Sequence, residues 1–240
     1  MRALLVAALC VAALPPSGAS AQLPDPPAAP SDADVSQARD RFVHGMELAE
    51  GEDWEPALAE FLRSYALSGS PVALFNVGST LRSLRRFVEA RAAFDRLLGD
   101  PEIDEEMRTV AEEMRLHVTA QVASVTVDGV PSGEASVVAG GAERAATRER
   151  PIEVELDPGP QALTVRLPAY APWSWRGTLE PGARLRLDAE LTPEPSGGGD
   201  ALGWILGVAG VVVAGVIIGL VVGDLEAQLD PRTSLVVAVP

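Results

Sequence analysis

The sequence predicts a multidomain α + β protein, with helical hairpins first, a small antiparallel β-sandwich second and one transmembrane helix near the C-terminus. Three patterns of apolar residues lead to this prediction. From Ala33 to about His117 apolar residues recur every three or four positions, as on one face of a helix. After Gln121 they alternate with polar residues, as in half-buried strands. From Ala201 to Val222 there is no charged residue.

These patterns, with the proline-rich and glycine-rich stretches between them, divide the chain into segments. The expected segments are a signal peptide (1–21), a disordered proline-rich segment (22–32), a helical domain with a capping helix (33–119), a β-sandwich (120–192), a linker (193–200), a transmembrane helix (201–223) and a short tail (224–240).

Residues 1–21 have the layout of a secretory signal: one arginine, an uncharged apolar run, and small residues just before the expected cleavage at Gln22. Cys10 is the only cysteine and lies in the apolar run. The mature chain is therefore expected to contain neither a disulfide nor a thiolate nucleophile. A lipidation cysteine is the alternative, but Leu9 precedes it where a small residue is expected.

The uncharged stretch 201–222 would be about 33 Å long as a helix at ~1.5 Å per residue, which is enough to cross a hydrocarbon core of roughly 30 Å. The sequence TPEPSGGGD before it is typical of a flexible tether. Because the signal exports the N-terminal body, the tail is expected in the cytoplasm. Glycines four residues apart would let two such helices approach closely and form a homodimer. They are Gly215, Gly219 and Gly223.

The net charge limits the class of partner. The chain has 34 acidic and 19 basic residues, a formal charge of −15. Nucleic acid and anionic lipid head groups would be repelled at long range, so we expect no nucleic-acid partner.

The helical region contains an internal repeat with an offset of 33 residues. The stretch WEPALAEF at 54–61 is similar to FVEARAAF at 87–94, and the same offset relates four pairs of residues. The pairs are Gly45 and Gly78, Trp54 and Phe87, Ala57 and Ala90, and Phe61 and Phe94.

A two-helix repeat of this length, with a glycine in the first helix and alanine and phenylalanine in the second, resembles the tetratricopeptide repeat. Pro101 lies near the repeat's terminal proline, whereas Leu48 and Leu81 replace its usual tyrosine. The resemblance covers about residues 37–101. Since two repeats seldom bury a continuous core, the amphipathic segment 102–118 is expected to be the cap.

The resemblance implies a groove lined by the first helix of each pair, which binds a peptide or protein. Asn76 could hold a peptide backbone, and arginines could bind an acidic side chain or a free C-terminus. The alternative is that the apolar residues are buried against the cap helix and that the arginines pair with Asp40 and Glu50. The residues expected in the groove are Arg39, Phe42, Met46, Phe75, Asn76, Ser79 and Arg82.

In the alternating region, VDGVPSG and LDPGPQ are typical of turns. The order V-x-V-D-G-x-P-x-G, then L-x-P-G-x-x-x-L-x-V, then an aromatic residue at Tyr170, resembles the PEGA domain. This family of small β-sandwiches occurs on exported bacterial proteins, often beside tetratricopeptide repeats and a membrane anchor. Gln161 stands where this family commonly has histidine, and Ala169 stands where it has glycine.

Two tryptophans in the sequence PWSWRG offer a different function. Trp173 and Trp175 would lie on one face of a strand and could stack on sugar rings if exposed. The sandwich would then make this a structural or cell-wall (glycan) binding protein. The alternative is that both tryptophans fill the sandwich core together with Leu179.

The sequence lacks the residue clusters that an enzyme needs. His44 and His117 are isolated, and no glycine-rich phosphate loop follows a strand. We therefore expect no catalysis, no cofactor and no metal. The resulting hypothesis is a non-enzymatic interaction module, anchored by a single span in a bacterial inner membrane with its main body in the periplasm.

Overall fold

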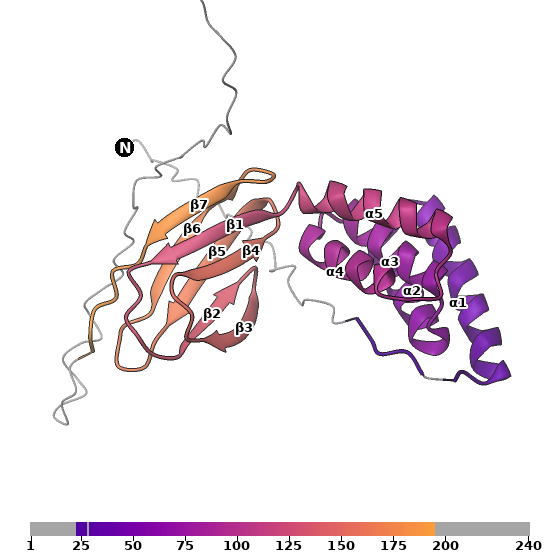
Figure 1. Cartoon of the computed structure of the whole chain (residues 1–240), viewed down its shortest axis with the longest axis horizontal. Helices are drawn as coiled ribbons and strands as arrows, with labels where there is room; N and C mark the ends of the chain where they lie inside the picture. The colour runs from indigo at the N-terminus through magenta and orange to yellow at the C-terminus, as the bar shows by residue number, and fades with distance from the viewer. Residues whose placement is uncertain (1–22, 28, 195–240) are drawn as a thin grey trace, which may run out of the picture.

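The computed structural model describes residues 23–27 and 29–194. Five helices are followed by seven strands in this part of the chain, which is therefore a mixed α + β protein (Figure 1). The helices are α1 (Asp32–Glu50), α2 (Trp54–Ser68), α3 (Pro71–Ser83), α4 (Phe87–Leu98) and α5 (Glu105–Thr119). The strands are β1 (Ala123–Asp128), β2 (Ala135–Ala139), β3 (Ala142–Thr147), β4 (Ile152–Leu156), β5 (Gly159–Arg166), β6 (Trp173–Leu179) and β7 (Arg184–Asp188).

The expected signal peptide, transmembrane helix and tail lie outside the described residues, and so do Gly215, Gly219 and Gly223. Among the residues that are described, no helix is long and apolar enough to cross a bilayer.

Polar caps and glycines set the limits of the helices. Ser31 and Asp34 form a capping box at the start of α1, with each side chain accepting a hydrogen bond from the other residue's backbone N–H at 3.2 and 3.0 Å. Asp104 caps α5 through a 2.7 Å bond from the N–H of Met107. Three of the helices end at a glycine. The glycines are Gly51 after α1, Gly69 after α2 and Gly99 after α4.

The 33-residue repeat encodes one packing unit, which occurs twice. A Cβ atom on Gly45 would lie 2.8 Å from the ring of Phe61, and a Cβ atom on Gly78 would lie 2.8 Å from the ring of Phe94. Only glycine lets the second helix bring its phenylalanine this close to the backbone of the first. Gly45, Phe61, Gly78 and Phe94 are all buried.

The helices pack mainly in sequence order: α1 on α2, α2 on α3, α3 on α4 and α4 on α5. Antiparallel helices joined by short loops give this arrangement. Ala111 of α5 lies one further offset of 33 from Gly78 and is fully buried. Thus α5, the expected cap, presents a small residue at the same position of the repeat.

Residues 23–27 of the proline-rich segment lie on the helices, although the sequence predicted a disordered stretch over 22–32. Leu23 packs against the apolar cluster of the helices. Arg96 of α4 donates hydrogen bonds to the carbonyl oxygens of Leu23 and Pro24 and to the carboxylate of Asp25. No local pattern in the segment could have indicated these contacts.

The strands form two facing sheets with a shared apolar core. One sheet has the order β4-β1-β7 and the other the order β3-β2-β5-β6. Alternate residues of β1 and β4 are buried, which confirms the alternation predicted for them. Strands β2 and β3 were not predicted, because their sequences, ASVVA and AERAAT, are rich in alanine and show no clear alternation.

The sheet containing β1 is mixed, whereas the sequence predicted only antiparallel strands. β1 pairs with β4 in antiparallel orientation and with β7 in parallel orientation, Val125 facing Leu185. A parallel pair needs a long connection between its strands. Here that connection is the whole chain from β2 to β6, so nothing near β1 or β7 could signal the pairing.

The tryptophans of β6 belong to the core. Trp175 is 9% exposed, and half-buried Trp173 and buried Leu179 belong to the same apolar cluster. A Cβ atom on Gly177 would overlap the ring of Trp175, which lies over the backbone of that glycine. This agrees with the core interpretation and leaves β6 without an exposed pair of tryptophans for stacking on sugar rings.

The sandwich holds the N-terminus of α4. The first residues of α4 lack a side-chain cap of their own. Instead the carboxylate of Asp157, in the turn between β4 and β5, accepts hydrogen bonds from the backbone N–H groups of Phe87 and Val88, the latter at 2.9 Å. Arg91 of α4 forms a bidentate ion pair with Glu155 of β4. Charged contacts therefore join the sandwich to α4.

Candidate functional site

The seven predicted groove residues divide between α1 and α3, both of which pack against α2. Those on α1 are separated by three and four positions, so they follow one side of the helix. We call these seven residues, on two helices that both pack against α2, the α1/α3 face. It consists of Arg39, Phe42 and Met46 on α1 and of Phe75, Asn76, Ser79 and Arg82 on α3.

The aromatic residues of this face are half buried and belong partly to the core. The ring centroid of Phe42 lies 5.5 Å from that of Phe61, and the ring centroid of Phe75 lies 5.8 Å from that of Phe94. These are edge or tilted contacts, as aromatic pairs prefer. The two phenylalanines therefore have a structural role, with only part of each ring left to meet a ligand.

Exposed apolar side chains continue the face beyond the predicted residues. Met46 is 38% exposed, and Val35, Val43 and Val72 are 39%, 51% and 46% exposed. The three valines were missed by sequence reasoning. Val72 could have been found, because it lies 33 residues after Arg39 and so occupies the same position of the repeat.

Two polar residues of the face form hydrogen bonds within their own helix. The amide nitrogen of Asn76 donates to the carbonyl oxygen of Val72 at 2.9 Å, one turn earlier in α3. Ser79 is half buried, and its carbonyl oxygen accepts a bond from the hydroxyl of Ser83. Because an amide nitrogen carries two hydrogens, Asn76 keeps one donor and its oxygen for a ligand.

The arginines differ in their surroundings but share the lack of an acidic partner. Arg39 is exposed and Arg82 is half buried, and neither forms an ion pair with any described residue. The alternative pairing with Asp40 and Glu50 is therefore wrong. The Nε atom of Arg82 is buried without a hydrogen-bond partner in the described part of the chain. A buried donor left unpaired costs free energy.

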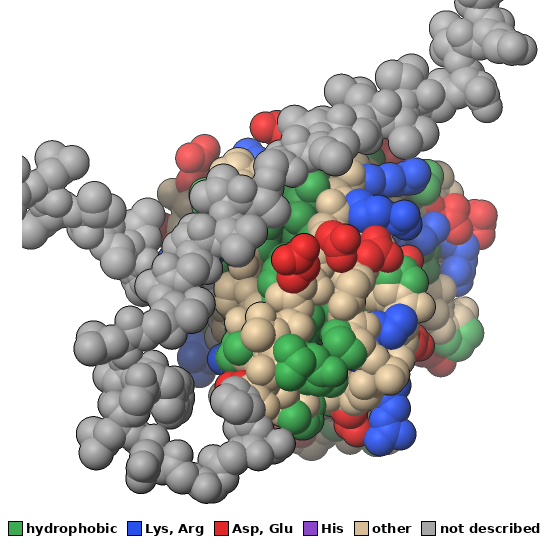
Figure 2. All heavy atoms as spheres, turned by 90° about the vertical axis from the view of Figure 1, so that its left-hand side faces the viewer, with side chains coloured by type: hydrophobic (Ala, Val, Ile, Leu, Met, Phe, Trp, Pro, Cys, Tyr) green, Lys and Arg blue, Asp and Glu red, His purple; other side chains and the backbone are tan. Residues whose placement is uncertain are grey.

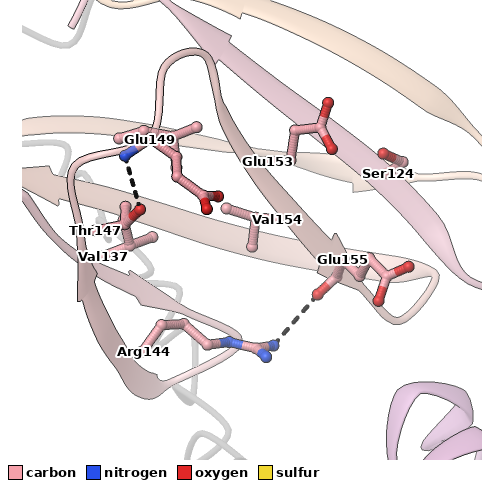
Figure 3. Close-up of a pocket in the computed structure, with 9 residues that line it drawn as sticks. Ser124, Val137, Arg144, Thr147, Glu149, Glu153, Val154 and Glu155 are labelled. Atoms are coloured by element: carbon pink, nitrogen blue, oxygen red, sulfur yellow. Dashed lines mark hydrogen bonds between the residues drawn. The ribbon is translucent and has the colours of Figure 1, made fainter.

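A second hollow, of about 410 Å³, lies in the sandwich where β3 and β4 form one open side. Figure 3 shows its rim, which carries three glutamates and Arg144 around apolar residues such as Val137 and Val154. The guanidinium of Arg144 donates to the carbonyl oxygen of Glu155 at 3.2 Å, and the N–H of Glu149 donates to the hydroxyl of Thr147 at 3.1 Å. These bonds use one N–H group of Arg144 and the hydroxyl of Thr147 within the sandwich itself.

The charges around the sandwich do not indicate one kind of ligand. Figure 2, which looks onto the sandwich, shows acidic and basic side chains on the same face. Bonding to Arg91 holds the pKa of Glu155 below its ordinary value, so this carboxylate stays charged and paired. Over residues 23–27 and 29–194 there is no cluster of three side chains that could hold a metal ion, and His44 and His117 are exposed and apart.

Comparison with known proteins adds no assignment: no protein-family model matches the chain, and no curated protein matches its sequence. The function must be inferred from the residues and contacts of the chain itself.

Proposed function

We propose that this protein is a non-enzymatic interaction module that binds a peptide or protein segment on the α1/α3 face. The single observation that carries the proposal is the combination, on these two helices, of exposed apolar side chains with two arginines that form no ion pair with a residue of the described part of the chain. Exposed apolar residues that lie together on a surface commonly mark an interaction site.

The chemistry of the face favours a ligand with an extended backbone and a carboxylate. Met46, Val43 and Val72 provide apolar contact. Asn76 provides one amide donor and one acceptor, which match a peptide backbone. Arg39 and Arg82 provide cationic donors in a chain whose formal charge is −15. An acidic side chain or a free C-terminal carboxylate suits an arginine best, because the guanidinium can bind it through two parallel bonds.

The repeated packing of glycine against phenylalanine supports the resemblance to tetratricopeptide repeats, whose first helices line a peptide groove. The sandwich then serves to hold the helical domain, through Asp157 and the Arg91–Glu155 pair. With the expected signal and membrane span, the module would be presented in the periplasm of a bacterium, on the inner membrane.

Partner capture in intact envelopes tests the proposal. The full-length chain with Arg82→Glu and Asn76→Ala should capture at least about tenfold less of its crosslinked peptide or protein partner. A few contacts in an interface usually carry much of the affinity. Arg166→Glu, on an exposed position of β5, is the matched control and should keep the partner.

Each variant must first show an unchanged melting temperature, so that loss of binding is separated from loss of fold. Retention of the partner by the folded Arg82→Glu/Asn76→Ala chain would rule out the α1/α3 face. The hollow of the sandwich would then be the next surface to test, with the variant Arg144→Glu.

A further inference from the structure

The N-terminal segment is bound to the helical domain in the manner of a ligand. Figure 1 shows residues 23–27 within the indigo trace that runs below the helices before α1 begins. Leu23 is half buried against the apolar cluster of the helices. Pro24 and Asp25 both contact Arg96 through oxygen atoms. The segment forms no helix or strand, so its contacts are those of an extended peptide on a preformed surface.

Arg96 of α4 is the central contact. Its guanidinium donates to the carbonyl oxygens of Leu23 and Pro24 at 3.4 and 3.1 Å and to the carboxylate of Asp25 at 2.6 Å. The same guanidinium lies over the ring of Tyr65, 5.6 Å from the centroid. This cation–π contact helps to hold the guanidinium beside the segment.

The surface also fits the prolines of the segment. Gly69 ends α2 with φ of +65°, and a Cβ atom there would lie only 3.1 Å from Cβ of Pro26. A larger residue would need to push the proline away. Prolines restrict an extended segment before it binds, which lowers the entropy lost on docking. Tyr65, Gly69 and Arg96 together therefore form a surface shaped for a proline-containing peptide.

The contacts are unequal in strength. The side chain of Asp25 is 95% exposed, so its ion pair with Arg96 is screened by water and contributes little. The burial of Leu23 and the two carbonyl bonds to Arg96 contribute more. Recognition thus depends chiefly on an apolar residue followed by a proline, and less on the acid.

We propose that Tyr65, Gly69 and Arg96 form a second peptide-binding site, distinct from the α1/α3 face, for extended peptides of the Leu-Pro-Asp-Pro type. Residues 23–26 of the chain occupy this site and so compete with any such peptide from another molecule. The site lies on α2, α4 and the glycine after α2, whereas the α1/α3 face lies on α1 and α3. The two proposals can therefore fail independently.

Competition by a tethered segment has a predictable size. Only a few residues separate the segment from α1, so its effective concentration at the site is on the order of 1 mM. A peptide with an intrinsic Kd of about 0.1 mM would then bind the intact chain about tenfold more weakly than a chain whose segment is released.

The test uses the full-length protein in detergent and a fluorescein-labelled peptide of sequence QLPDPP. Leu23→Asp with Asp25→Arg releases the tethered segment. Fluorescence anisotropy should show about tenfold tighter binding of the peptide to this released chain than to the wild type. Adding Arg96→Gln to the released chain should reduce the affinity at least tenfold. Adding Arg166→Gln, on the sandwich, is the matched control and should not.

A peptide with asparagine in place of aspartate should bind the released chain only two- to threefold more weakly. A peptide with alanine in place of leucine should lose more of its affinity. Equal affinity for the released chain with and without Arg96→Gln would overturn the site. Equal affinity for the wild type and the released chain would overturn occupation by residues 23–26. No binding to the released chain at 1 mM peptide would overturn both, and an unchanged melting temperature of every variant excludes misfolding as the cause.

Discussion

The two helical hairpins, α1–α2 and α3–α4, are built on the same packing unit but lie in different surroundings. In each, the phenylalanine ring of the second helix lies so close to a glycine of the first that a Cβ atom added to the glycine would be 2.8 Å from the ring. The hairpin α3–α4 lies between α2 and α5, and α3 buries six residues, whereas α1 packs mainly against α2 and buries two. The same Gly–Phe packing unit therefore occurs in a hairpin at the centre of the helical domain and in a hairpin at its end.

The hairpins also differ inside. In the first, Glu60 is buried and forms ion pairs with Arg41 at 3.2 Å and Arg63 at 2.5 Å. At the equivalent position, 33 residues later, the second hairpin has the fully buried Ala93. The first hairpin is thus held partly by polar contacts that water can replace, and the second by close apolar packing. The second hairpin also contacts the sandwich, through hydrogen bonds to Asp157 and Glu155.

The largest expected difference follows from truncation of the two phenylalanines. Phe94→Ala should lower the free energy of unfolding by about 4 kcal/mol, because the ring is fully buried and neighbours on both sides of the hairpin hold the cavity open. Phe61→Ala should cost about 3 kcal/mol, because α1 can move inward to fill part of the space. Urea denaturation of both variants measures the difference. A larger cost for Phe61→Ala would contradict this account of the two hairpins.

Enlargement of the glycines should have the next largest effect. Gly78→Ala should destabilise the protein by about 1–2 kcal/mol, because its methyl group overlaps the ring of Phe94 and this outweighs the gain in helix propensity of about 1 kcal/mol. Gly45→Ala should lower the free energy of unfolding by less than Gly78→Ala does.

A double-mutant cycle tests the cause of this effect. The smaller side chain in Phe94→Leu should relieve the overlap, so the two changes together should cost less than the sum of each alone. Strict additivity would show that the close approach of Gly78 to the ring does not limit the packing.

The buried carboxylate of the first hairpin should matter less than the phenylalanines. Glu60→Ala recreates the alanine of the second hairpin and should cost about 1 kcal/mol. Arg41 and Arg63 are 40% and 60% exposed, so both can return to water once the acid is removed. Thermal or urea unfolding measures the change. A loss above about 3 kcal/mol would show that the arginines are left uncompensated.

The smallest effect concerns the joint between the second hairpin and the sandwich. Burial raises the pKa of Asp157 above its ordinary value of 3.8, in spite of the N–H groups of Val88 and Phe87. The folded chain therefore binds the proton more readily than the unfolded chain, and the contribution of Asp157 to stability falls as pH rises from about 3.8 through the raised pKa.

Asp157→Asn keeps an acceptor for the N–H of Val88 but cannot titrate. The stability of this variant relative to the wild type should therefore increase as pH rises through this window, which urea denaturation at several pH values would measure. A constant difference between the two proteins would contradict the raised pKa.

Much of the helical part could be predicted, because its signals are local. Glycines and prolines mark the ends of the helices, and the offset of 33 residues relates the positions that pack in the same way. The candidate face was predicted less completely. The repeat indicated Met46 and Arg82, yet Val35 and Val43 were missed and the amide of Asn76 is partly used by its own helix.

The sequence by itself determined that the helices precede the strands, the repeated Gly–Phe unit and the alternation of β1 and β4, because each depends on residues a few positions apart or on one constant offset. The tertiary structure alone decided the parallel pairing of β1 with β7, the capping of α4 by Asp157 and the docking of residues 23–25 on Arg96. Each of these contacts joins residues 60 or more positions apart in the chain. Such contacts form only where the whole fold offsets the entropy of closing so long a loop, and no local pattern records which partners will meet.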